Sequence, residues 1–243
     1  MKNTFVFLLF ISLNCLGQSP IQCDRPDQTE TSFTVPKGRF QLESGFSFKK
    51  DDDLKTYSLP SSLWKYGIAK SWELRMITEW NSDVVGGEKL AGIQPIQLGA
   101  KVNFCEEKKG RPKTSLIAHL AIPDWASPEY KGNYYAPNFR FTLQNTLMDG
   151  LNLGYNVGAN WSPFDGKPSG LYTLTLGYSL TQDLGFYGEI FGFFPQNEKP
   201  NHSIDGGFTY LISNDFMLDL SAGKRIAGET ADFYLAFGIS FRI

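Results

Sequence analysis

The most regular feature of the chain is an alternation, with a period of two residues, between bulky apolar side chains and small or polar ones. From Arg39 onward it recurs in segments of about ten residues that turn-forming residues separate. A period of two indicates β-strands, whereas a helix repeats its apolar positions every three to four residues. The pattern predicts about twelve strands, at residues 39–48, 59–67, 71–80, 95–104, 113–122, 137–147, 151–161, 170–180, 184–194, 203–212, 215–224 and 231–243.

The last of these segments, "DFYLAFGISFRI", shows what the two faces look like. One face carries Phe233, Leu235, Phe237, Ile239, Phe241 and Ile243, and the other carries Tyr234, Ala236, Gly238, Ser240 and Arg242. In "GLNLGYNVGANW" the large apolar residues alternate with asparagine and glycine. A soluble β-sandwich usually covers its outer faces with lysine and glutamate, so these faces favour lipid outside and a confined polar interior.

The connections between the predicted strands also alternate in length. They are longer at 49–58, 81–94, 123–136, 162–169, 195–202 and 225–230, and shorter at 68–70, 148–150, 181–183 and 213–214, with 105–112 as the exception. Outer-membrane barrels pair short periplasmic turns with longer external loops, and an even strand number places both ends on one side. We therefore predict an all-β fold, a closed antiparallel transmembrane β-barrel of about twelve strands, with a secreted soluble β protein as the alternative.

The first seventeen residues have the pattern of a secretory signal peptide. Lys2 precedes an apolar run from Phe5 to Leu13, and small residues end at Gly17. A lipoprotein signal through Cys15 is the less favoured alternative. The sequence thus predicts a signal peptide at 1–17, a periplasmic or lumenal N-terminal segment at 18–38, and a barrel at 39–243 that reaches the outer membrane after export.

Composition narrows the expected partners. The formal net charge of -2 over 243 residues provides no basic field for nucleic acid. The two histidines and the cysteines form no metal-ligand spacing, so no metal site and no cofactor are expected. Aromatic residues make up 15% of the chain, and several lie near predicted strand ends, where the lipid headgroups would be. The expected partners are outer-membrane lipid and an unidentified small solute.

Several stretches of the sequence resemble a known family. They are "DRPDQTETSFTVPKGRFQLESGF", "KYGIAKSWELRM", "GIQPIQLGAKV" and "MLDLSAGKRIAGETADFYLAFGISFRI". They resemble the outer-membrane β-barrel proteins grouped as transporters of the MetA pathway of phenol degradation, over nearly the whole mature chain. The resemblance implies a barrel in the Gram-negative outer membrane that serves as a transporter or channel, with aromatic compounds among its candidate solutes. Cys23 stands where the family pattern leads us to expect threonine.

The inward-facing positions carry charges of both signs, which must pair or stay hydrated because an isolated buried ion costs several kcal/mol. Two interpretations are open: the charges line a permeation path, or they hold a closed structural barrel in shape without conductance. The candidates for the path are Glu43, Arg75, Glu79, Lys101, Arg140, Glu189 and Arg242.

The octet "CDRPDQTE" precedes the first predicted strand and supplies a second group of charges. Its candidates for a plug or gate are Asp24, Arg25, Asp27 and Glu30, and a strap that closes the barrel bottom is the alternative. A cation site built from its carboxylates is less favoured. Cys23 and Cys105 both fall at the predicted periplasmic end, so a disulfide between them is a hypothesis, with two free thiols as the alternative.

A membrane-embedded hydrolase is the remaining alternative. Ser115 and His119 lie four residues apart on one predicted strand, hence on the same face, but nothing in the sequence supplies a recognisable oxyanion site. The sequence therefore predicts a protein that is not an enzyme.

Overall fold

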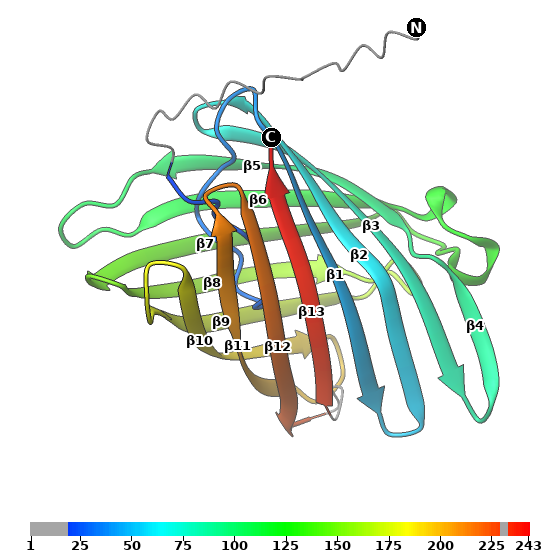
Figure 1. Ribbon diagram of the computed structural model, residues 1–243. Coiled ribbons are helices and arrows are strands. Elements are labelled where there is room, and N and C mark those ends of the chain that lie inside the picture. Colours follow the sequence, from blue (N-terminus) through cyan, green and yellow to red (C-terminus); the bar gives the residue numbers. More distant parts are fainter. Residues whose placement is uncertain (1–18, 229–232) are drawn as a thin grey trace, which may run out of the picture.

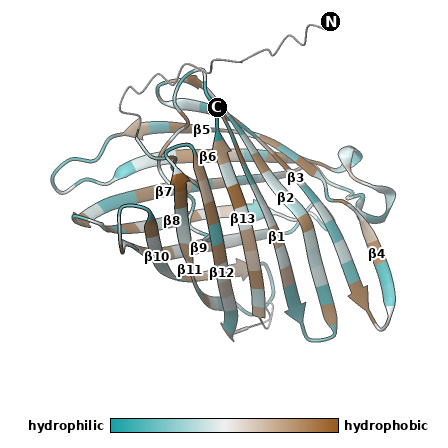
Figure 2. Cartoon of the chain, in the orientation of Figure 1, coloured by the Kyte–Doolittle hydropathy of each residue, from teal (hydrophilic) through white to brown (hydrophobic). Residues whose placement is uncertain are grey.

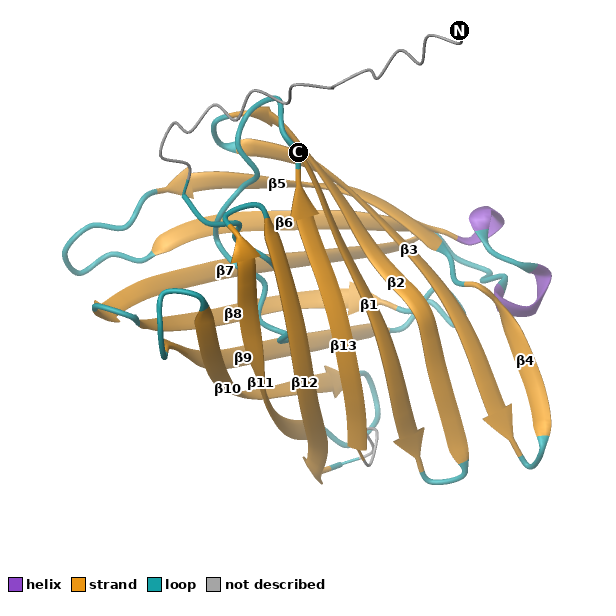
Figure 3. Cartoon of the chain, viewed as in Figure 1, coloured by secondary structure: helices purple, strands orange, loops and turns teal. Residues whose placement is uncertain are grey.

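The computed structural model describes residues 19–228 and 233–243, so the predicted signal peptide lies outside the described residues. Strands dominate, with two short 3₁₀ helices (Figure 3). The elements are β1 (Phe40–Asp51), β2 (Leu54–Ala69), β3 (Trp72–Val85), β4 (Glu88–Ile93), β5 (Ile96–Cys105), β6 (Lys113–Ile122), η1 (Pro123–Trp125), η2 (Pro128–Tyr130), β7 (Ala136–Met148), β8 (Leu151–Trp161), β9 (Pro168–Ser179), β10 (Leu184–Pro195), β11 (Asn201–Ser213), β12 (Phe216–Ala227) and β13 (Phe233–Arg242).

The strands form a closed antiparallel barrel (Figure 1). Strand β1 pairs with both β2 and β13, and β2 pairs with β3, which completes the ring. Strand β4 is extra: it pairs with Trp80–Val85 of β3, while Trp72–Ile77 of β3 pair with β5. The prediction of about twelve strands is confirmed, with β4 as one strand that the sequence did not indicate.

The barrel is apolar outside and polar inside, which is the reverse of a soluble protein. On β12 and β13 the outward Leu220 and Leu235 are 56% and 52% exposed, whereas the inward Asp219 and Ser240 are buried. Figure 2 shows the corresponding alternation of brown and teal along the strands. Large contiguous apolar surfaces are rare in water, so this belt fits a lipid environment. No helix within the described residues is long and apolar enough to cross a membrane, a finding that does not concern strands.

Two predicted long loops are wrong. Strands β1 and β2 continue through most of 49–58 and leave a turn of only two residues, and most of 81–94 forms the hairpin of β3 and β4. Beyond the membrane both faces of a hairpin meet water. The apolar alternation therefore fades while the backbone pairing continues, which makes the strands look shorter in the sequence.

Residues 19–39, here called the inner segment, precede β1 and lie in the bore of the barrel (Figure 1, blue). Near its start, the Ile21 N–H donates to the Asn214 carbonyl at 2.8 Å. Near its end, the Gly38 N–H donates to the Gly67 carbonyl at 2.7 Å. Both contacts lie at the end of the barrel where β13 finishes, so the segment enters and leaves the bore through the same, periplasmic mouth.

Candidate permeation path and the segment that fills it

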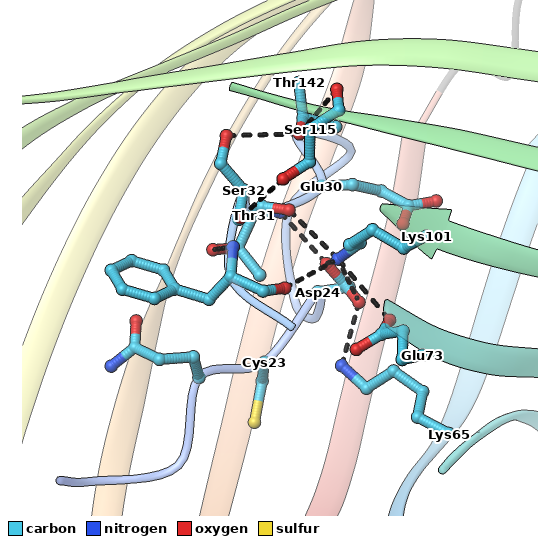
Figure 4. A network of polar contacts seen from close by, with 12 residues as sticks. Cys23, Asp24, Glu30, Thr31, Ser32, Lys65, Glu73, Lys101, Ser115 and Thr142 are labelled. Atoms are coloured by element: carbon cyan, nitrogen blue, oxygen red, sulfur yellow. Dashed lines mark hydrogen bonds and ion pairs between the residues drawn. The ribbon is translucent and has the colours of Figure 1, made fainter. Parts of the chain in front are cut away.

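A cluster of ions fixes the inner segment to one side of the bore (Figure 4). The Asp24 carboxylate lies 2.8 Å from Lys65 Nζ, 3.0 Å from Arg75 Nη1 and 2.9 Å from Lys101 Nζ. These cations project from β2, β3 and β5, which we call the cationic wall, and their side chains are at most 1% exposed. Burial by itself raises the pKa of Asp24, but Lys101, Lys65 and Arg75 outweigh it and hold that pKa well below its usual value.

Two further carboxylates bind both the cations and the backbone of the inner segment. Glu43 contacts Lys65 and accepts the backbone N–H groups of Asp24 at 2.8 Å and Arg25 at 3.0 Å. Glu73 pairs with Arg75 at 2.8 Å and accepts the Val35 N–H at 2.7 Å. Hydrogen bonds to charged groups are stronger than neutral ones, so these bonds hold the backbone of the inner segment in addition to its Asp24 side chain.

Further along the inner segment, neutral side chains of the barrel join the ions as partners, while the Glu30 carboxylate still pairs with Arg75. The Glu30 N–H donates to Asn156 Oδ1 at 2.7 Å, and Asn156 Nδ2 donates to the Glu30 carbonyl at 3.0 Å. The Ser32 carbonyl accepts from Ser115 Oγ at 2.7 Å, and the Ser32 hydroxyl donates to Thr142 Oγ1 at 3.1 Å. Side chains of the barrel therefore bond these backbone groups of the inner segment, as the backbone of a neighbouring strand would in a sheet.

The opposite side of the bore, formed by β10, β11 and β12, is acidic, and we call it the acidic wall. It carries Glu189, Asp205 and Asp219, of which Glu189 and Asp205 face each other in the strand register. Arg25 pairs with Asp219 at 2.9 Å. Burial, followed by the nearby charges of Glu189 and Asp205, raises the pKa of Asp27 on the inner segment well above its usual value.

The predicted site residues fall into two groups. Most of the path candidates contact the inner segment: Glu43, Arg75, Lys101 and Glu189, together with Arg140, whose Nη1 donates to the Gln28 carbonyl at 2.9 Å. Glu79 lies nearer the external mouth, where it accepts from Ser58 Oγ at 3.0 Å. Arg242 lies at the periplasmic rim, where it pairs with Asp215 at 2.6 Å and also contacts the start of the inner segment by donating to the Ser19 carbonyl at 2.8 Å. The permeation roles of all these residues stay predictions.

Lys65 and Glu73 belong to the same cluster, although they are not among the candidates singled out from the sequence. Each occupies the same parity on its strand as the other inward-facing residues, and this parity is the signal that points it into the bore. The parity cannot show that Asp24 would be their shared partner.

The disulfide hypothesis is wrong, because Cys23 and Cys105 are both free. Anchoring of Asp24 draws Cys23 into the bore beside β1, where its Sγ lies 3.9 Å from Gln41 Nε2. Cys105 is the last residue of β5, and β2 and β3 lie between β5 and β1 in the barrel. The two thiols therefore lie on different parts of the periplasmic half.

Ser115 and His119 each have a different partner. Ser115 Oγ donates to the Ser32 carbonyl, and His119 Nε2 accepts from Arg75 Nε at 3.1 Å. Both side chains thus take part in the network around the inner segment. Within residues 19–228 and 233–243, no cluster of histidine, cysteine, aspartate or glutamate side chains is arranged to hold a metal ion.

A closed twelve-strand barrel with an apolar belt and a polar bore defines an outer-membrane β-barrel. The chain belongs to the family described as "Putative MetA-pathway of phenol degradation", whose model matches residues 23–243. The resemblance noted in the sequence is thereby confirmed. None of the curated proteins compared with the chain is a significant match.

Solved structures with the same fold are named as channels and porins. An outer membrane channel from Pseudomonas putida F1 is 11% identical, covers 91% of this chain and 100% of its own, and has a TM-score of 0.69. The NanC porin is also 11% identical, with 82% and 98% covered and a TM-score of 0.61. The KdgM porin is 11% identical as well, with 83% and 98% covered and a TM-score of 0.56. At this identity the likeness concerns the fold.

Proposed function

We propose that the protein is a passive channel or transporter for small solutes in the outer membrane, and that the inner segment occludes its bore in the conformation described. The observation that carries this proposal is the chemistry of the bore, which is filled by ions and hydrogen bonds. Apolar side chains of similar volume would fill a purely structural barrel with equal or greater stability. A polar lining is useful where water and solutes replace the segment. The names of the structurally similar channels and porins agree with this role.

The cavities of the barrel outline the path. Cavities of about 230 and 330 Å³ lie between the inner segment and the periplasmic half of the wall. A third, of about 340 Å³, lies at the external mouth. The middle of the inner segment, around Gln28 to Glu30, lies between them, because it is bonded to Arg140 and Asn156 halfway along β7 and β8. Displacement of this segment would join the cavities.

The walls of the opened bore would carry opposite charge. Release of Asp24 would leave the cations of the cationic wall with Glu43 and Glu73 as their remaining partners. The acidic wall would lose Arg25. A bore with cations on one side and carboxylates on the other selects solutes by charge as well as size. This is the permeation role we assign to Arg75, Lys101 and Glu189, and the proposal includes no catalytic step.

Liposome swelling and conductance in planar bilayers test the proposal. We expect the purified protein to admit small solutes faster than protein-free vesicles do, and Asp24→Asn to raise the rate because it loosens the inner segment. A series of neutral, cationic, anionic and aromatic solutes measures selectivity. Heat-modifiable migration on gels serves as the control for folding. If folded wild type and variant both fail to conduct, the protein is a closed structural barrel and the proposal fails.

A further inference from the structure

The cavity at the external mouth has a chemistry of its own. Its volume of about 340 Å³ lies at the lower end of the range for small-molecule sites. The polar side chains that line it are five carboxamides and one carboxylate: Asn81, Gln94, Gln97, Asn138, Asn160 and Glu79. No residue of the inner segment lines it, so the cavity is present while the bore is occluded.

Three of these carboxamides have an oxygen without a partner. The Oδ1 atoms of Asn81, Asn138 and Asn160 are buried and, within the described part of the chain, receive no hydrogen bond. Buried polar atoms are normally bonded, so three such atoms around one cavity need an explanation. A half-turn of a carboxamide exchanges its oxygen and nitrogen. Side chains that are not fixed through their oxygens can turn and offer either a donor or an acceptor to a solute.

The rim of the cavity is braced by contacts between two external loops. The N–H groups of Asn133 and Tyr134 donate to the Pro163 carbonyl at 2.8 and 3.0 Å. The Tyr130 hydroxyl donates to Asp83 of β3 at 2.9 Å. These contacts hold the connection between β6 and β7 against both the next loop and the barrel wall. The cavity is therefore preformed, and binding would not have to order a loose loop.

The charges around the cavity disfavour anions as its ligands. Glu79 is the one charged residue among the described residues that line it, and its carboxylate accepts from Ser58 Oγ. An anion would meet this carboxylate with no lysine or arginine in the lining to balance it. Carboxamides both donate and accept, which matches hydroxyl groups because these also do both. Trp161 and Phe164 add apolar surface that can pack against the C–H groups of a solute.

We infer that this cavity binds a neutral polyhydroxylated solute of about monosaccharide size. At the roughly 30 Å³ that one water occupies in the liquid, the cavity holds about eleven non-hydrogen atoms. A phenol has a single hydroxyl and would leave most of the carboxamides unpaired, whereas a sugar has a hydroxyl for each. The inference rests on the proposed function, since it names the solute class that the channel takes from outside.

Ligand-detected saturation-transfer NMR on the purified barrel tests the inference, in a detergent without a sugar headgroup. The probes are D-glucose, gluconate and phenol. We expect saturable glucose binding in the millimolar range, because a permeating solute must also leave. The double variant Asn81→Leu with Asn160→Leu should weaken glucose binding at least tenfold. Asn152→Leu is the matched control, because Asn152 lies on the same strand and parity as Asn160 but lines the periplasmic cavities.

Other results would overturn the inference: saturable binding of phenol or gluconate without glucose, no binding of any probe, or equal loss in the control variant. Liposome swelling on the same preparations separates this inference from the proposed function. Swelling without glucose binding contradicts the site and leaves the channel in place. Glucose binding that is lost in the double variant, but without swelling, supports the site and contradicts the channel.

Discussion

The two walls of the bore hold the inner segment in different ways. On the cationic wall, Lys65, Arg75 and Lys101 converge on one carboxylate, Asp24, and each charge has an opposite charge within hydrogen-bond distance. The network is buried, so it is little screened by salt and strongly coupled. Removal of one member therefore leaves several buried charges with fewer opposite charges around them.

On the acidic wall, carboxylates are in excess. Arg25 neutralises Asp219, but Glu189 and Asp205 face each other across neighbouring strands, and the segment contributes Asp27 to the same region. Besides the Arg25–Asp219 ion pair, the segment is held there by hydrogen bonds to Glu189, from the Gln28 N–H at 2.7 Å and from the Thr29 hydroxyl. The cationic wall therefore anchors the segment, and the acidic wall is where the segment would separate first.

The largest expected effect is that of Asp24→Ala. It leaves buried cations without their shared partner, a change that costs about 3–5 kcal/mol in other proteins. We expect a loss of that size in the free energy of unfolding, measured by denaturant titration of the barrel in detergent micelles. Asp27→Ala is the control and should not lower the stability, because it removes a buried charge from an acidic region. Equal losses in the two variants would contradict the difference between the walls.

Acidification should act on the two walls in opposite directions. The inner segment is not one of the membrane-spanning strands, and its Asp27 has a raised pKa, so the ionised form weakens the folded state. From neutral pH down to about 4, stability should therefore rise as Asp27 is protonated. The pKa of Asp24 is depressed, so its stabilisation is complete above about pH 4 and is lost at lower pH.

The thermal unfolding midpoint between pH 7 and pH 2 measures this behaviour. Asp27→Asn should flatten the rise between pH 7 and pH 4 and leave the fall below pH 4 unchanged. A midpoint that falls steadily over the whole range would show that the acidic wall does not repel the segment.

Glu189→Gln should change the stability of the barrel by less than the Asp24 substitution does. Glutamine keeps an acceptor for one of the two hydrogen bonds from the segment and removes the like charge beside Asp205. We expect the free energy of unfolding to change by about 1 kcal/mol or less. Glu73→Gln is the matched change on the cationic wall and should cost more, because Arg75 and the Val35 N–H lose a charged partner. The reverse order would contradict our assignment.

The smallest effect concerns the thiols. Burial, followed by the Glu43 charge, raises the pKa of Cys23 well above its usual value, and the thiolate is the reactive form. We expect Cys23 to be alkylated slowly in the wild type and faster in Asp24→Ala, with mass spectrometry as the readout. Cys105, outside the inner segment, should react at the same rate in both proteins. Unreduced protein should show two free thiols in each case.

Much of the fold follows from the sequence because lipid on one side and a polar bore on the other impose a strict period of two. The boundaries of β6 and β8 agree with the predicted ones. The pattern fails where lipid is absent on both faces, as in β4 and in the outer ends of β1 and β2. There the strands are held by backbone pairing with their neighbours, and the residue pattern of one segment alone does not indicate this pairing.

The site is predictable only in part. Parity places Arg75 and Lys101 in the bore, and the charges of the octet indicate a partner for them. The actual pairs depend on the path of the inner segment, as Arg25 and Asp219 show, which lie 194 residues apart in the sequence. Hydroxyl and amide partners such as Ser115 and Asn156 carry no charge that would mark them in advance.

The position of both ends of the inner segment at one mouth has a consequence for assembly. A chain that crossed the barrel from end to end would have to be threaded through its whole length. A re-entrant finger needs no threading, so it can enter a finished cylinder and withdraw again without breaking the seam between β1 and β13. Insertion of the inner segment during assembly and its withdrawal when the channel opens would then be the same movement in opposite directions.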